Sequence, residues 1–100
     1  MRKTTRRIIE DLAEEYLNSK DYHRGFINHE WIEKITLELD LRNLTDYELS
    51  NMWDMVYLTL NNRFNHYYVN EEHRKAMKYL DVQSAFTEVV NVEARRRRGE

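Results

Sequence analysis

The chain contains no cysteine and no proline, and only two glycines, Gly25 and Gly99. The absence of cysteine excludes disulfides, thiolate zinc sites, iron–sulfur clusters and cysteine nucleophiles. The scarcity of glycine and proline argues against a sandwich or barrel, because such folds need frequent turns. It also excludes a glycine-rich phosphate-binding loop, which needs at least two glycines close together.

Long apolar runs are missing as well. No segment approaches the roughly 18 apolar residues of a membrane-spanning helix, so no membrane partner is expected. The pair Ile8-Ile9 that follows the basic start is too short for a secretory signal. Together with the lack of cysteine, this predicts a cytoplasmic protein. The 100 residues, 41% hydrophobic and 34% charged, have the composition of a single globular domain over residues 1–100.

Apolar residues recur at helical spacing through most of the chain. This predicts an all-α fold, a small compact bundle of four to five helices. The first predicted helix is capped by Thr4 or Thr5 and runs from about Arg6 to Asn18. Its apolar residues fall on one face: Ile8, Ile9, Leu12, Ala13 and Tyr16. The second predicted helix begins after Asn28, a favoured N-cap residue. A competing strand period covers the end of the second helix, where apolar and polar residues alternate: Ile35, Leu37, Leu39 and Leu41. Helix is favoured there because no second alternating run is available to pair with a strand.

A capping box, Thr45 with Glu48, starts the third predicted helix, which runs to about Asn65. Its apolar stripe is expected at the centre of the core: Leu49, Met52, Trp53, Val56, Tyr57, Leu60 and Phe64. Asn70 is the predicted cap of a fourth helix, whose apolar positions drift between two faces. That drift predicts a kink or a further short helix near residues 81–83.

The charge of the chain is divided between its middle and its ends. Sixteen bases and 18 acids give a net charge of −2. Half of the bases lie close to the two ends: Arg2, Lys3, Arg6, Arg7, Arg95, Arg96, Arg97 and Arg98. Because salt limits electrostatic reach to about 8–10 Å, the sequence predicts an acidic body with basic N- and C-terminal tails. Residues 1–5 and 94–100 are candidates for disorder, although the arginines also suit the end of a helix.

The leading hypothesis is a non-enzymatic protein-interaction module, an inhibitor or adaptor that engages a basic, nucleic-acid-binding protein. Carboxylates on helix faces imitate spaced phosphates, as suits small inhibitors in viral or mobile-element settings. The acidic candidates lie in the first two predicted helices: Glu10, Asp11, Glu14, Glu15, Glu30 and Glu33. Aromatic candidates lie in loops or on polar flanks: Tyr22, Phe26, Tyr67 and Tyr68. The many aromatics and the two-faced last helix also suit a homodimer.

The alternative hypothesis is nucleic-acid binding. The segment from Asn61 to Leu80 interleaves bases with Phe and Tyr, a pattern that proteins use to bind single-stranded nucleic acid. The basic candidates are in this segment and at the C-terminus: Arg63, Arg74, Lys75, Lys78, Arg95, Arg96, Arg97 and Arg98.

An enzyme is not expected. No serine stands in a glycine-flanked nucleophile turn. His29 and Glu33 share a helix face, but the second histidine of a zinc-binding helix is missing. We therefore predict no catalytic residue, no metal site and no cofactor.

Overall fold

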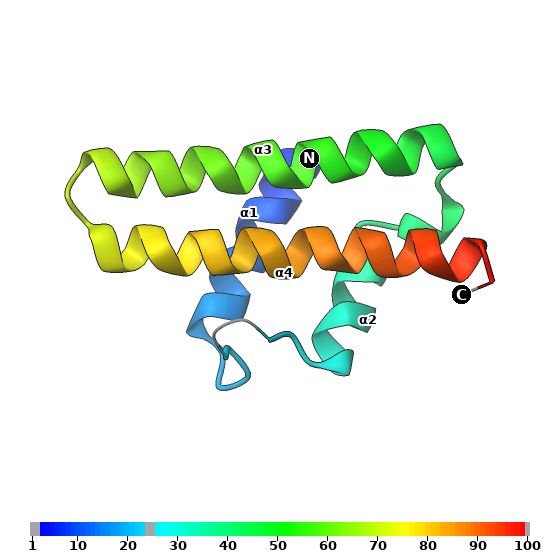
Figure 1. Ribbon diagram of the computed structural model, residues 1–100, viewed down its shortest axis with the longest axis horizontal. Helices are drawn as coiled ribbons and strands as arrows, with labels where there is room; N and C mark the ends of the chain where they lie inside the picture. The colour runs from blue at the N-terminus through cyan, green and yellow to red at the C-terminus, as the bar shows by residue number, and fades with distance from the viewer. Residues whose placement is uncertain (1–2, 24–25, 100) are drawn as a thin grey trace.

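The computed structural model describes residues 3–23 and 26–99. Two long antiparallel helices pack side by side, and the other elements lie against them (Figure 1). The elements are α1 (Thr5–Asn18), α2 (His29–Glu38), a short 3-10 turn η1 (Leu41–Asn43), α3 (Asp46–Val69) and α4 (His73–Arg97). The predicted all-α bundle is confirmed, with four α-helices among the described residues. None of these helices combines the length and apolar composition needed to cross a membrane.

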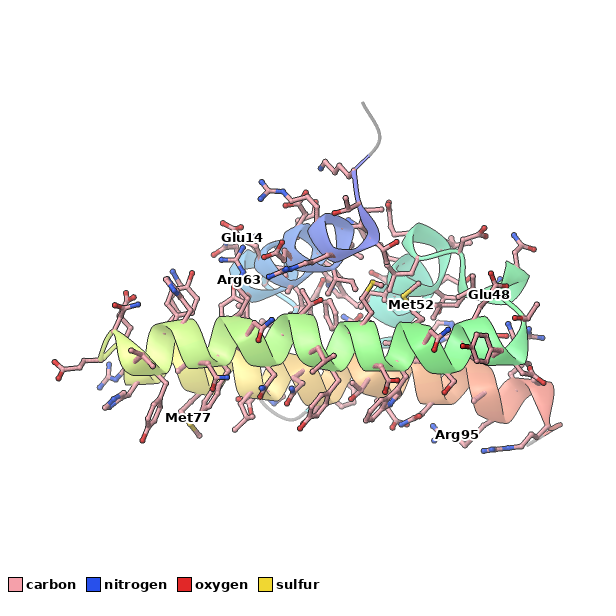
Figure 2. The ribbon with its side chains drawn as sticks, turned by 90° about the horizontal axis from the view of Figure 1, so that it is seen from above. Glu14, Glu48, Met52, Arg63, Met77 and Arg95 are labelled. Carbon is pink, nitrogen blue, oxygen red and sulfur yellow. The ribbon has the colours of Figure 1, made fainter. Side chains whose placement is uncertain are left out.

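The hairpin of α3 and α4 forms one layer, and α1 and α2 form the other. Figure 2 shows α1 and α2 on the same side of this hairpin, with Glu14 and Met52 on that side. Met77 and Arg95 lie on the opposite side, which no other element of the described chain covers. The molecule therefore has one packed interface between layers and one open hairpin surface.

Tyr16 joins three helices at the centre of the core. Its ring, 1% exposed, packs edge-on against Trp31 of α2 at 5.1 Å between centroids and lies 5.9 Å from Phe86 of α4. Its hydroxyl donates to the Phe26 carbonyl at 2.6 Å, so the connection before α2 is also fixed to α1. Burial raises the pKa of Tyr16 above its ordinary value, which keeps this hydroxyl a donor.

Three predicted helix starts are confirmed by their hydrogen bonds. Thr4 and Asn28 accept from backbone amides at the first turns of α1 and α2, at 3.2 and 2.9 Å. Thr45 and Glu48 form both bonds of the capping box. Each side chain satisfies an amide that would otherwise lack a partner within the helix.

The predicted cap at Asn70 is wrong. α3 continues past Asn65 to Val69, and Asn70 ends that helix, donating from its side chain to the His66 carbonyl at 2.7 Å. The turn to α4 then uses Glu71 in the left-handed conformation, with φ of 61°. Polar asparagines near residue 65 suggested a break, but a solvent-facing helix surface accommodates them without one.

The predicted kink at residues 81–83 is also wrong, because α4 is one helix from His73 to Arg97. Both of its apolar faces have a neighbour. Val82 and Phe86 are buried toward α1 and α2, whereas Gln83 reaches α3, where its Nε2 donates to the Tyr57 carbonyl at 3.0 Å. The apolar positions of α4 drift because this helix packs against α3 on one side and against α1 and α2 on another.

Residues 35–41 form the end of a helix and a turn, and not a strand. Ile35 is buried inside α2, whereas Leu37 is 62% exposed. The helix ends at Glu38, and Asp40 then takes a left-handed conformation with φ of 53°, which places Leu41 back in the core. Inside α2 the burial follows helical spacing, because Ile35 and Thr36 are both buried and Leu37 and Glu38 are both exposed. The alternation of apolar residues in the sequence is therefore not an alternation of burial.

Arg95, Arg96 and Arg97 belong to α4, and Arg98 is its C-cap, so this segment is not a disordered tail. Glu93 is 3% exposed and accepts from Arg96 Nη2 at 2.6 Å and Arg97 Nε at 3.0 Å. Arg97 also donates to Asp46 Oδ1 at 3.0 Å and to the Leu41 carbonyl at 2.7 Å. We call Glu93, Arg97, Asp46 and the Leu41 carbonyl the Glu93–Arg97 clamp. It ties the end of α4 to η1 and to the start of α3.

Arg97→Met is expected to lower the free energy of unfolding by about 3 kcal/mol, because it leaves Glu93 buried with one donor fewer. Urea denaturation at pH 7 measures the loss. Arg95→Met is the matched control, because Arg95 pairs with Glu88 near the surface and such pairs contribute at most about 1 kcal/mol. Equal losses for the two variants would contradict the role of the clamp.

Acid is expected to unfold the protein through lowered carboxyl pKa values. Hydrogen bonds from Arg96 lower the pKa of Glu93, the Thr45 amide lowers that of Glu48, and Lys3 lowers that of Asp11. A lowered folded-state pKa adds stability above the unfolded value, 4.5 for Glu, and that stability is lost as the pH falls through the folded value. Urea midpoints are expected to be level from pH 7 to 5.5 and to fall below about pH 4.5. Glu93→Gln, less stable at neutral pH, is expected to show a shallower fall; a parallel fall would assign the acid sensitivity to other groups.

Ile35→Ala is expected to cost about 3 kcal/mol of unfolding free energy, because it opens a cavity between α2 and the hairpin. Leu37→Ala, two residues away and exposed, is expected to cost less than about 0.5 kcal/mol. Thermal or urea unfolding of the two variants separates these values. A large loss for Leu37→Ala would instead favour the strand pattern.

Candidate interaction surface

Most acidic candidates are neutralised by the protein's own bases. Asp11 lies 2.7 Å from Lys3 and 3.3 Å from Arg7. The further pairs, with their shortest distances, are Glu10 with Arg63 at 3.1 Å, Glu15 with Lys34 at 3.0 Å and Glu33 with Arg42 at 3.0 Å. These pairs alternate in sign over α1, α2 and their neighbours, so the carboxylates do not form a continuous negative row.

Glu14 and Glu30 are the acidic candidates that form no ion pair among the described residues, and both are exposed. They lie on different helices, α1 and α2. Two separated carboxylates give weak electrostatic attraction in water.

The four aromatic candidates fall into two separate groups. Tyr22 and Phe26 lie in the connection between α1 and α2; Tyr22 packs edge-on against Tyr16 at 5.5 Å, whereas Phe26 is exposed. Tyr67 and Tyr68 lie at the end of α3. Tyr67 stacks on Tyr79 at 5.3 Å and is half-buried, and Tyr68 is 54% exposed. Phe26 and Tyr68 are therefore the two that present most of their ring to solvent.

Most basic candidates are engaged within the fold. Arg63 is half-buried, and its buried Nε lies beside Glu10 without hydrogen-bond geometry. Arg95 pairs with Glu88, and Arg96 and Arg97 pair with Glu93. Lys75 lies over the Tyr67 ring, 4.4 Å from its centroid. Arg74 and Lys78 are exposed and form no ion pair among the described residues.

The open side of the hairpin carries a surface that the sequence pattern did not isolate. We call it the hairpin face and define it by residues at helical spacing from the two helices: Ser50, Trp53, Tyr57, Asn61, Phe64 and Tyr68 of α3, with Met77, Leu80, Ser84 and Asn91 of α4. Met77 marks its direction in Figure 2, opposite Met52 and Glu14. Tyr57 is 41% exposed and Met77 is 42% exposed.

The hairpin face carries few charges. Asp54 is exposed and lies one turn from both Ser50 and Tyr57, and from there to Glu71 the chain has one further ionised residue, Arg63, which points toward Glu10 of α1. On α4, Glu88 and Arg95 follow Ser84 and Asn91 by one turn and pair with each other. In a chain with 34% charged residues, this stretch of aromatic, methionine and small polar side chains stands apart.

The rings of the hairpin face are ordered in stacked pairs. Trp53 and Tyr57 stack at 5.4 Å with planes 8° apart, and Phe64 and Tyr68 stack at 5.6 Å. Tyr68 also stacks on His73 at 4.9 Å, across the turn. Stacking on rigid helices fixes the rings before any partner arrives, which reduces the entropy lost on binding.

Tyr57 was expected in the core and lies on this surface instead; Trp53 and Phe64 are only partly buried. The reason is that α3 carries two apolar rows side by side. Leu49, Val56 and Leu60 fill the core, and the row of aromatics lies beside them. One row is enough to form the core stripe of a helix. The second row is an excess of apolar residues, and this excess was the sequence signal that could have revealed the exposed aromatics.

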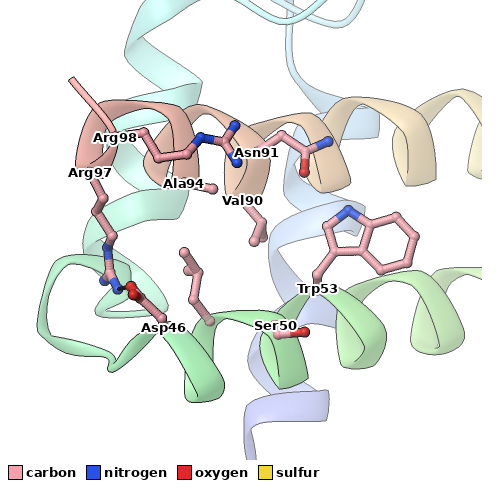
Figure 3. A pocket seen from close by; sticks show the side chains of 9 residues that line it. Asp46, Ser50, Trp53, Val90, Asn91, Ala94, Arg97 and Arg98 are labelled. Atoms are coloured by element: carbon pink, nitrogen blue, oxygen red, sulfur yellow. Dashed lines mark hydrogen bonds and ion pairs between the residues drawn. The ribbon is translucent and has the colours of Figure 1, made fainter. Parts of the chain in front are cut away.

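A cavity of about 410 Å³ lies where the Trp53 end of the face meets the end of α4. Figure 3 shows Trp53 and Ser50 of α3 opposite Asn91 and Ala94 of α4, with Arg97 bonded to Asp46 at the far end. The cavity is a groove between the two helices and is continuous with the hairpin face.

Within the described residues, no three His, Asp or Glu side chains come together in a group that suits a metal ion. Comparison of the chain with protein-family models, with curated proteins and with solved structures finds no match. The geometry of the hairpin face is therefore the basis for a functional proposal.

Proposed function

We propose that this chain is a protein-interaction module that binds another protein chain through the hairpin face. The observation that carries the proposal is a row of stacked aromatics, with Tyr57 and Tyr68 exposed and Trp53 and Phe64 partly buried, on a surface with few charges. Aromatic and methionine side chains are enriched at the centres of protein interfaces, and charged residues are depleted there. Leaving these rings in water forfeits burial energy that a protein partner restores.

The layered fold gives the hairpin face its rigidity. α1 and α2 pack on the other side of the hairpin, and the Glu93–Arg97 clamp holds its open end. A surface on two supported helices keeps its shape on binding, so little energy is spent on ordering it. An adaptor or inhibitor needs no more than such a prearranged surface.

The acidic side chains have a secondary part in this proposal. Their pairing with Lys3, Arg7, Lys34, Arg42 and Arg63 leaves no row of carboxylates that imitates a nucleic acid. Glu14 and Glu30 remain to attract a basic partner at long range. We therefore assign the direct contact with the partner to the hairpin face rather than to the acidic side chains.

Nucleic-acid binding has a narrower basis. Arg74 and Lys78 are exposed near Tyr22, and these three residues line the same shallow cavity. The other basic candidates with a described environment are occupied by Glu10, Glu88, Glu93 or the Tyr67 ring. Two cations neutralise about two phosphates, which gives weak binding at physiological salt.

A nuclease-treated capture experiment tests the proposal. The tagged chain is incubated with a lysate that also contains an untagged copy, and retained proteins are compared among wild type, Tyr57→Glu and Leu37→Glu. Tyr57→Glu places a charge in the middle of the hairpin face and is expected to reduce the retained partner at least tenfold. Leu37→Glu is the matched control, because Leu37 is an exposed apolar residue of α2, away from this face.

Equal retention by the wild type and Tyr57→Glu would contradict the proposal, and so would equal loss from both variants. A partner that disappears on nuclease digestion would instead favour nucleic-acid binding. In that case Arg74→Gln with Lys78→Gln is expected to weaken retention and to reduce its salt dependence.

A further inference from the structure

We propose that a cavity between α1 and α3 binds a phosphate group, either as the free ion or as the monoester of a small molecule. The cavity has a volume of about 260 Å³ and is lined by six residues: Arg6, Glu10, Thr59, Asn62, Arg63 and His66. It lies on the side of the hairpin where Figure 2 shows Arg63 beside α1. None of the six residues belongs to the hairpin face, so this site is separate from the proposed partner surface.

The helical spacing of the chain brings two arginines to this cavity. Arg6 and Glu10 are four residues apart on α1, so they share a face of that helix. Thr59 and Arg63 are likewise four residues apart on α3. Because α1 packs against α3, the two pairs meet across the contact between the helices.

Arg63 is held by Glu10, but only part of its guanidinium is used. Glu10 Oε2 lies 3.1 Å from Arg63 Nε without the geometry of a hydrogen bond, and Nε is buried with no other partner. The two terminal nitrogens form no hydrogen bond or ion pair among the described residues. An unpaired buried donor is unfavourable, and an anion bound beside it offsets part of the cost. The terminal nitrogens are the donors that a phosphate accepts from, often two at once.

Thr59 supplies a second unpartnered polar group. It is 4% exposed and lines the cavity, and its hydroxyl forms no hydrogen bond among the described residues. The other buried threonines that the structure describes, Thr36 and Thr87, donate to the backbone carbonyl one turn back, at 2.7 and 2.8 Å. A buried hydroxyl without that backbone bond is available to donate to a ligand instead.

The charges and donors of the cavity suit an anion with several oxygens. Arg6 forms no ion pair among the described residues, so the two arginines outnumber the one carboxylate of the cavity, Glu10. Asn62 and His66 are exposed and add N–H donors at the rim. Donors from five side chains on two helices suit the three or four oxygens of a phosphate group better than the two of a carboxylate. The exposed rim leaves room for the rest of a monoester to extend into solvent.

An NMR titration with inorganic phosphate tests the site. In a phosphate-free buffer at constant ionic strength, phosphate is expected to shift the amide signals of Thr59, Asn62 and Arg63 saturably. The expected dissociation constant is about 1 mM or less, within reach of a ligand of this size. Chloride at the same ionic strength is the control for screening. Glycerol phosphate in a second titration distinguishes the sources: tighter binding than inorganic phosphate assigns a monoester, and weaker binding assigns the free ion.

Arg6→Gln and Arg7→Gln form a matched pair of variants. Both residues are exposed in the first turns of α1, but only Arg6 lines the cavity, whereas Arg7 pairs with Asp11. Arg6→Gln is expected to raise the dissociation constant for phosphate about fivefold or more, and Arg7→Gln less than about twofold. Equal effects would indicate general attraction by positive charge and would overturn the site.

Thr59→Val removes the hydroxyl and nearly preserves the shape of the side chain. Because this hydroxyl has no partner in the fold, the free energy of unfolding in urea is expected to stay level or to rise, whereas phosphate binding weakens about fivefold. Thr87→Val is the matched control, because it loses the bond to the Gln83 carbonyl. It is expected to lower the stability and to leave phosphate binding unchanged.

Three results of these experiments contradict a phosphate site between α1 and α3. The first is a set of shifts that stays linear far above the expected dissociation constant, or that chloride reproduces. The second is unchanged phosphate binding in Thr59→Val. The third is a set of shifts confined to residues 73–78, which would place the anion at Arg74 and Lys78 instead.

Discussion

The packing of α3 against α4 is the interaction on which the other elements depend. Both helices bury apolar residues at their contact, including Val56, Leu60 and Val90, and the Gln83 side chain sets their register. α1 and α2 contact each other only slightly and gain most of their burial from the hairpin. A short turn closes one end of the hairpin, and the Glu93–Arg97 clamp closes the other. The carboxylate of Glu93 can be buried there because hydrogen bonds from two guanidinium groups offset the cost of its desolvation.

Ion pairing explains why formal charge is a poor guide to this surface. The sequence suggests an acidic body with two basic tails, yet described bases from both ends, including Lys3, Arg7 and Arg97, pair with acids of the body. Arg97 of α4 pairs with Asp46 of α3, and Lys3 pairs with Asp11 of α1. The charge blocks of the sequence are thus mixed in space. What remains distinctive is a surface with few charges of either sign.

The fold class, three helix caps and the core of α1 could be predicted because each depends on neighbours within a few residues. Thr45 with Glu48 is an example, since both partners of the capping box lie in one turn. The candidate surface could not be predicted in this way. Whether Tyr57 lies in the core or in solvent depends on which side of α3 receives α1, a contact between residues far apart in the chain. The kink expected in α4 failed for the same reason, because its second apolar face is covered by α3.

The chain order of the helices also has a consequence for how the fold is reached. α3 and α4 are joined by residues 70–72, so their pairing closes a short loop at small entropic cost, whereas α1 must reach α3 across a connection that includes α2. Local pairing forms fast and distant docking forms more slowly. The chain order therefore predicts that the hairpin assembles first, with both of its sides bare, and that the N-terminal half then docks on one of them. Tyr16, which meets Trp31 and Phe86 together, gives that late step its specificity.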